Sequence, residues 1–325
     1  MVVSADIIIA ERLKRIMLKR AIFVVLVVTL AVACSDNRTG IARAQGATAE
    51  NGCKEGSVVP EKLRFGLAGY WGGMGDEKSF SPFVDMLSKS VGIPIEIKLF
   101  DAYESLVRAL QSGELEIALL PPLAYVQAKA KMPCLKPLRT IVVSGHVMYR
   151  GYVLVRNDAD IIKPKDLRGK RLALVEPWSS SGYLFPLAWL MRSNLHPTQD
   201  LGSIVLTNSH HECIKAVLDG RVDACGTFEG AVQKARRDGL PTEMLRVVGV
   251  TGRIPNDAVV VHPKVSQTVK DSLDKAFDRL NTTTPEGRIA LAPLLDITGF
   301  ALTDDHFYDH VRSVMKKVSI LGLDL

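Results

Sequence analysis

Segments typical of β-strands and of α-helices alternate along most of this chain, and this alternation restricts the fold more than any other feature. Apolar runs such as IPIEIKLF (93–100) and LEIALL (115–120) are followed by amphipathic stretches, for example YESLVRALQSG (103–113), several of which stop at a glycine. Such alternation predicts an α/β protein with mostly parallel sheets flanked by helices. With 47% hydrophobic and 23% charged residues, the chain can bury a core of that kind.

The strand–helix pattern restarts near residue 166, and a length of 325 residues suits two lobes. The stretches ALQSGELEIA (109–118) and VLDGRVDAC (217–225) are alike: in each, a helix end, a glycine and a strand follow one another. We therefore expect two lobes of one design, each with a mostly parallel sheet. The expected bounds are 58–150 plus 257–325 for lobe one and 151–256 for lobe two, with crossover strands near Tyr149–Arg156 and Pro255–Val261.

The N-terminus has the features of a secretory signal. Lys19 and Arg20 precede the 13 apolar residues AIFVVLVVTLAVA (21–33), a run that is short for a membrane span. The AVAC ending is similar to a bacterial lipoprotein signal, in which Cys34 becomes the acylated mature N-terminus; ordinary cleavage after Ala33 is the alternative. We expect residues 1–34 to be a signal peptide with an upstream extension that precedes Met17. Residues 35–57, which are small, polar and aperiodic, are expected to be a flexible tether.

The charge of the chain gives no sign of a nucleic-acid surface. The formal net charge is +6, and half of it comes from the first 33 residues, which contain five Lys or Arg and two acids. The rest of the chain shows no basic run. No spacing typical of a metal site, a bound cofactor or a catalytic nucleophile is present either, so we expect no cofactor, no metal and no enzymatic activity.

The stretch EPWSSSGYLFP (176–186) lies where a predicted strand, RLALV (171–175), turns into a predicted helix. The first N–H groups of a helix lack partners within the helix, and the helix dipole adds partial positive charge there. Three serine hydroxyls and a glycine at such a junction favour an anion-binding site. Simple N-capping by one serine is the alternative.

From Leu63 to Ala301 the sequence resembles the periplasmic phosphonate-, phosphite- and phosphate-binding proteins of ABC importers. The resemblance rests on five segments that occur in the family's order. These are LFDAYESLVRALQSGELEIALL, YRGYVLVRND, DLRGKRLALVEPWSSSGYLFP, HHECIKAVLDGRVDA and TGRIPND. It implies a two-lobed clamp of the type II class, a small oxyanion ligand, and permease and ATPase partners encoded elsewhere. We expect a monomeric, membrane-anchored periplasmic lipoprotein.

The resemblance also implies particular ligand-binding residues. Two tyrosines, the serine triplet, a histidine and an acid match the family's motifs, Glu229 matches more loosely, and Tyr70 lies in a glycine-rich segment where family members also contact ligand. The full set is Tyr70, Tyr103, Tyr149, Ser179, Ser180, Ser181, His210, Glu229 and Asp257. Tyrosine and histidine donate hydrogen bonds to anionic oxygens, and Asp257 suits a ligand that still carries a proton.

Each of these residues also has a structural explanation. The two tyrosines suit packing at a lobe interface, and Asp257 suits a turn after Pro255. His210 suits an exposed helix start, and His211 beside it makes the choice between the two histidines ambiguous.

Four cysteines follow Cys34, and an even number in an oxidising compartment is expected to pair. Cys213 and Cys225 flank one helix–glycine–strand unit and either form a disulfide or stay buried as thiols. Alternatively, together with Cys134 as a further candidate, they offer soft ligands for a thiophilic species such as arsenite. The sequence therefore predicts a solute-binding protein for a phosphorus oxyanion. The alternative is a related sensor of an oxyanion or arsenite that reports to a membrane histidine kinase.

Overall fold

The computed structural model describes residues 53–54, 56–68, 77–294 and 296–322, all of which belong to the second of two units of the chain, Asn51–Leu325. The predicted signal peptide with Cys34, most of the tether, and Tyr70 lie outside the described residues. Cys53, five residues before the expected start of the fold, is disulfide-bonded to Cys134. Gly56 and Val58 then form bridges to Ser266 and Val265.

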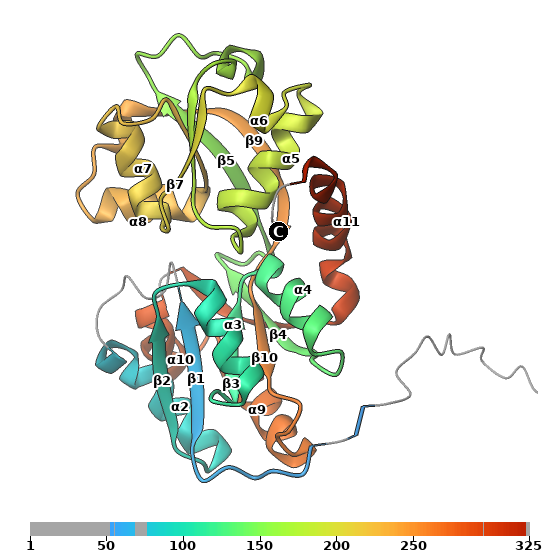
Figure 1. Cartoon of the computed structure of the whole chain (residues 1–325). Helices are drawn as coiled ribbons and strands as arrows, with labels where there is room; N and C mark the ends of the chain where they lie inside the picture. Colours follow the sequence, from blue (N-terminus) through green and yellow to red (C-terminus); the bar gives the residue numbers. More distant parts are fainter. Residues whose placement is uncertain (1–52, 55, 69–76, 295, 323–325) are drawn as a thin grey trace, which may run out of the picture. The chain divides into compact units, whose positions relative to one another are not determined.

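One sheet of the second unit has six strands, and helices cover both of its faces (Figure 1). In spatial order the strands are β11 (Ile297–Leu302), β4 (Pro137–Val143), β10 (Ala258–Val261), β3 (Ile117–Leu120), β1 (Leu63–Ala68) and β2 (Ile95–Phe100). Alternate residues of β3 enter different cores: Ile117 and Leu119 pack with α2 (Ser81–Val91), α9 (Gln267–Arg279) and α10 (Pro285–Leu291), whereas Ala118 and Leu120 pack with α3 (Tyr103–Ser112) and α4 (Pro122–Lys131). A strand with hydrophobic residues on both faces is typical of a sheet covered on both sides.

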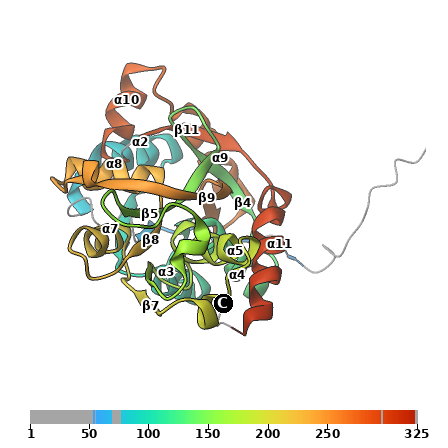
Figure 2. The ribbon, with the colours of Figure 1, turned by 90° about the horizontal axis from the view of Figure 1, so that it is seen from above.

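The other sheet has five strands. Their order is β7 (Ser203–Leu206), β6 (Arg171–Leu174), β8 (Ala224–Phe228), β5 (Met148–Arg156) and β9 (Leu245–Pro255). α5 (Phe185–Arg192) covers one face, and α7 (His210–Leu218) and α8 (Glu229–Arg237) cover the other. The short helix α6 (Pro197–Asp200) leads into β7, and the C-terminal helix α11 (Asp309–Val318) packs on both α4 and α5 (Figure 2).

The predicted α/β fold is confirmed, but the sheets are mixed rather than mostly parallel. Parallel pairing joins β1 with β2 and β3, and β6 with β7 and β8. The strands near the two connections, β4, β5, β9, β10 and also β11, pair antiparallel. β11 lies between α10 and α11 and adds an edge strand to the six-stranded sheet, where it pairs with β4.

The chain passes between the two sheets twice, once after β4 and once after β9. Asn256, on the returning segment, is almost completely buried and ties both passages together. Its side-chain amide donates to the carbonyl oxygens of Ile141 (3.0 Å) and His146 (2.8 Å). Its backbone N–H donates to the carbonyl oxygen of Val147 (2.9 Å). The two connecting segments are therefore cross-linked directly beside Asp257.

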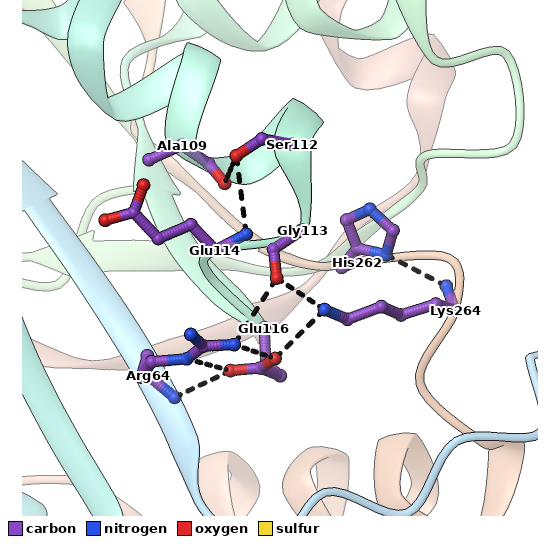
Figure 3. A network of polar contacts seen from close by, with 8 residues as sticks. All are labelled: Arg64, Ala109, Ser112, Gly113, Glu114, Glu116, His262 and Lys264. Atoms are coloured by element: carbon purple, nitrogen blue, oxygen red, sulfur yellow. Dashed lines mark hydrogen bonds and ion pairs between the residues drawn. The ribbon is translucent and has the colours of Figure 1, made fainter.

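The similarity between residues 109–118 and 217–225 corresponds to the same polar arrangement in each sheet. In the first sheet Arg64 donates to the buried carboxylate of Glu116 (2.7 and 3.0 Å) and to the carbonyl oxygen of Gly113 (3.3 Å), and Lys264 also reaches Glu116 (3.1 Å) (Figure 3). This network fastens the start of β1 to the turn that precedes β3.

In the second sheet Arg171 binds Asp223 (2.9 and 3.1 Å) and the carbonyl oxygen of Gly220 (3.0 Å) in the same way. The glycine has a positive φ in both places, 78° for Gly113 and 70° for Gly220, which is the backbone conformation that a glycine C-cap supplies. The repeat thus reflects one local construction used twice.

Among the described residues, no helix has both the length and the apolar character needed to cross a membrane.

Candidate ligand-binding site

A cavity of about 650 Å³ lies where the ends of strands and the starts of helices from the two sheets meet. Eight of the nine residues expected at the site line it, and the ninth, Tyr70, is outside the described residues. The eight are Tyr103, Tyr149, Ser179, Ser180, Ser181, His210, Glu229 and Asp257. Residues from distant parts of the sequence thus converge on one hollow of a size that holds a small organic molecule.

Three of these residues are each the first residue of a helix that follows a strand. Tyr103 begins α3 after β2, His210 begins α7 after β7, and Glu229 begins α8 directly after β8. In α/β sheets ligands bind beyond the carboxyl ends of the strands, where unpaired helix N–H groups point outward. The arrangement therefore places polar side chains and partial positive charge along the same wall of the cavity.

The serine triplet opens a short π-helical turn, Ser180–Leu184, that continues into α5. All three serines are buried, at 1–3% exposure, yet their roles differ. Ser179 is the N-cap, because its Oγ accepts from the N–H of Gly182 (3.0 Å). Ser180 Oγ accepts from the N–H of Leu123 (2.9 Å), at the start of α4. The capping alternative thus holds for Ser179, whereas the hydroxyls of Ser180 and Ser181 also interact with the hydroxyl of Tyr149.

Gly182 packs closely against the end of the strand that precedes the serines. A Cβ at this position would lie 2.4 Å from a methyl carbon of Val175, so a larger residue would collide with it. The glycine therefore permits close packing between that strand and the helix.

Tyr149 lies beside the serine triplet, in β5, the strand that follows the first connecting segment. Burial is the main cause that raises the pKa of its hydroxyl, and the negative charge of Asp257 raises it further, whereas hydrogen bonding with Ser181 and Ser180 acts in the opposite direction. The hydroxyl therefore stays protonated at every physiological pH and serves as a neutral hydrogen-bond donor.

His210 is buried (6% exposed), and burial lowers the pKa of its imidazole to about 3. Its Nδ1 lies 2.9 Å from the hydroxyl oxygen of Thr227, and its ring packs edge-on against Phe228. His211 does not line this cavity; its Nδ1 lies 3.6 Å from a carboxylate oxygen of Asp238. Of the two histidines, His210 therefore lines this cavity, as a neutral ring, and His211 does not.

Glu176 was missed by the sequence analysis. It is 7% exposed, and burial raises the pKa of its carboxyl group to about 7. One carboxyl oxygen accepts from the backbone N–H of Tyr103 (3.4 Å), so Glu176 reaches from the end of β6 to the start of α3. It lines a second hollow of about 400 Å³ that shares Tyr103 and His210 with the first. The only sequence signal was its place between the predicted strand and the serines.

Charged residues at the cavity were also missed. Arg150 and Arg253 both line it, as does Asp296, which forms an ion pair with Arg237 (3.2 Å). Arg237 ends α8, whereas Asp296 precedes β11, so this pair links the two sheets. Arg150 and Arg253 lie in YRGY and TGRIP, two of the segments that carry the family resemblance, but nothing in the sequence indicates that they face each other.

The soft-ligand interpretation of the cysteines is wrong, because these sulfurs are used in disulfides. Cys53 is bonded to Cys134, and Cys213 is bonded to Cys225. The second bond joins the first turn of α7 to β8 and is buried behind His210. Within the ranges that the structure describes, no group of three or more His, Cys, Asp or Glu residues is arranged to hold a metal ion.

Two mixed sheets, two connecting segments and a polar cavity at their junction match the type II fold of periplasmic binding proteins. The chain belongs to the family described as ABC transporter, phosphonate, periplasmic substrate-binding protein, whose model matches residues 76–308.

Known proteins of the same kind share much of the chain. The phosphate-import protein PhnD of Mycolicibacterium smegmatis is 27% identical over 262 residues, which are 77% of this chain and 78% of that protein. A binding-protein component of an ABC phosphonate transporter from Pseudomonas aeruginosa superposes with a TM-score of 0.70 at 19% identity, covering 83% of this chain and 88% of that one. A Prochlorococcus marinus protein in complex with methylphosphonate superposes with a TM-score of 0.69 at 18% identity, covering 80% of this chain and 99% of that one.

Proposed function

We propose that this chain captures a phosphorus oxyanion, namely phosphate, phosphite or a phosphonate, outside the cytoplasm and delivers it to the permease and ATPase of an ABC importer. The observation that carries the proposal is the convergence of the serine triplet, two tyrosines, neutral His210 and Asp257 on one cavity. The relatives support it, since one is named a phosphate-import protein and another was solved with methylphosphonate.

The serines, tyrosines, His210 and Asp257 of the cavity together favour a ligand that keeps a proton. Serine and tyrosine hydroxyls and a neutral imidazole are donors without net charge, whereas Asp257 is an acceptor when ionised. A P–OH group can donate to Asp257, and sulfate, which has no proton at neutral pH, is repelled. The site therefore suits monoprotonated phosphorus oxyanions and discriminates against sulfate.

The family is one of binding proteins, and we propose that this member is likewise not an enzyme. We further propose that 58–150 plus 257–325 and 151–256 are the two lobes that close on the ligand. Acylation of Cys34 would hold a monomer at the membrane. The sensor alternative loses its arsenite form, because Cys134, Cys213 and Cys225 are all in disulfides.

Calorimetry in phosphate-free buffer tests the proposal with phosphate, phosphite, methylphosphonate and sulfate. We expect at least one phosphorus oxyanion to bind and sulfate to bind at least tenfold more weakly. Ser181→Ala should weaken binding roughly tenfold or more, because a lost charge-assisted hydrogen bond costs about 1.5–3 kcal/mol. Asp257→Asn should reduce the discrimination against sulfate. Binding of sulfate as tight as that of phosphate, or no binding of any phosphorus oxyanion, would overturn the proposal.

A further inference from the structure

Two arginines face each other in the wall of the cavity. Arg150 and Arg253 are direct partners in the antiparallel ladder of β5 and β9, and both line the hollow that contains the serine triplet. Side chains directly opposite each other in such a ladder start about 4.5–5.5 Å apart, and two like charges in these positions repel each other. Both side chains are exposed, so water weakens this repulsion, and an anion between them or beside them would remove it.

Within the described part of the chain, neither arginine forms an ion pair. Two of the three acids that line the cavity contact other groups: Asp296 is paired with Arg237, and Glu229 interacts with the hydroxyl of Tyr152, which Arg150 also contacts. The third, Asp257, lies on the returning segment four residues after Arg253 and forms no ion pair with it among the described residues.

The cavity has room for more than a phosphorus oxyanion. Its volume of about 650 Å³ lies in the range of pockets that enclose whole organic molecules. Its wall includes the apolar side chains Met148, Phe228 and Ile297, which suit the methylene groups of an organic substituent.

We propose that Arg150 and Arg253 form a subsite for a second anionic group, carried at the far end of the substituent of the bound phosphonate. The substrate class is then a phosphonocarboxylate, because paired guanidinium groups bind a carboxylate through several charge-assisted hydrogen bonds. This inference rests on the proposed function, since it assumes that the serine triplet holds the phosphonate end of the same molecule.

Calorimetry with matched ligand pairs tests the subsite. Phosphonoacetate, 3-phosphonopropionate and 4-phosphonobutyrate are compared with methyl-, ethyl- and propylphosphonate, so that each pair differs in the terminal carboxylate. For at least one chain length we expect the carboxylate ligand to bind at least fivefold more tightly than its alkyl partner. In Arg253→Gln and in Arg150→Gln this ratio should fall to near one. Arg279→Gln is the matched control, since Arg279 is exposed and does not line the cavity.

The outcomes separate this inference from the proposed function. The subsite does not exist if alkylphosphonates bind but no carboxylate ligand binds fivefold more tightly than its alkyl partner. It also does not exist if this difference in affinity persists in both Arg150→Gln and Arg253→Gln. In either case the proposed function stands. A gain that Arg279→Gln removes equally would show only a general attraction of anions, which also overturns the subsite. If no phosphonate of either series binds, the subsite is overturned, and the proposed function fails with it only if phosphate and phosphite do not bind either.

Discussion

Replacing Glu176 by glutamine should remove a pH dependence from the stability of the protein. Burial raises the pKa of this carboxyl from 4.5 to about 7, so the native protein holds a proton that the unfolded chain releases. Between these two pH values the free energy of unfolding must therefore fall as the pH rises. At 1.36 kcal/mol per pH unit, the full cost above pH 7 is about 3 kcal/mol.

Glutamine has nearly the shape of the protonated carboxyl, and its oxygen can still accept from the N–H of Tyr103. The variant should therefore match the parent below pH 4.5 and exceed its stability by up to about 3 kcal/mol above pH 7. The buried imidazole of His210 has the opposite effect. Its pKa is lowered from 6.5 to about 3, so the unfolded chain takes up a proton that the native protein does not, and the free energy of unfolding falls as the pH falls below 6.5. Both proteins contain His210, so the difference between them isolates Glu176.

Urea unfolding followed by tryptophan fluorescence measures this difference at pH 4.5, 5.5, 6.5 and 7.5, in phosphate-free buffers so that no ligand stabilises the native state. Glu61→Gln is the control, since it removes an exposed carboxylate that does not line the cavity. Curves for parent and Glu176→Gln that stay parallel across this range would refute the assignment of a protonated, buried Glu176.

Three further predictions concern the cap, a disulfide and the ion pair beside the cavity. Ser179→Ala should lower the free energy of unfolding by about 1 kcal/mol, because the N-cap bond to Gly182 is lost; an unchanged urea midpoint would show that this bond contributes nothing. Replacing both Cys53 and Cys134 by serine should cost about 2–4 kcal/mol, since the bond closes a loop with a sequence separation of 81; equal unfolding curves with and without the bond would contradict this. Arg237→Gln should change stability by less than about 1 kcal/mol, as expected of a half-exposed pair, yet should raise the ligand dissociation rate in stopped-flow measurements; an unchanged rate would exclude a role in holding the cavity closed.

The sequence predicted the order of strands and helices well because each boundary has a local cause. Gly113 ends α3 and Pro122 opens α4, and both signals act within a few residues. The convergence of the site residues was also predictable, since residues that follow parallel strands meet at one edge of a sheet.

Features that depend on contacts far apart in the chain were not predictable. Ser180 accepts a hydrogen bond from the N–H of Leu123, which is 57 residues away in the sequence. The disulfide joins Cys53 to Cys134, which are 81 residues apart. The role of Asn256 depends on carbonyl groups more than 100 residues away, so its sequence context indicated only a turn. Arg150 and Arg253 become neighbours only through the register of two antiparallel strands.

The packing of α11 has a practical consequence for the design of a fluorescent biosensor. This helix contacts both α4 and α5, and His310 on it lies against Phe185, with ring centroids 5.6 Å apart, so apolar packing joins the two sheets on this side. Arg237, which ends α8, pairs with Asp296, and α8 lies on the side away from α11 (Figure 1). We expect an opening of the cavity to be resisted mainly at α11 and to be widest near position 237. An environment-sensitive dye belongs at position 237, and a reference dye that must not respond belongs on the exposed face of α11.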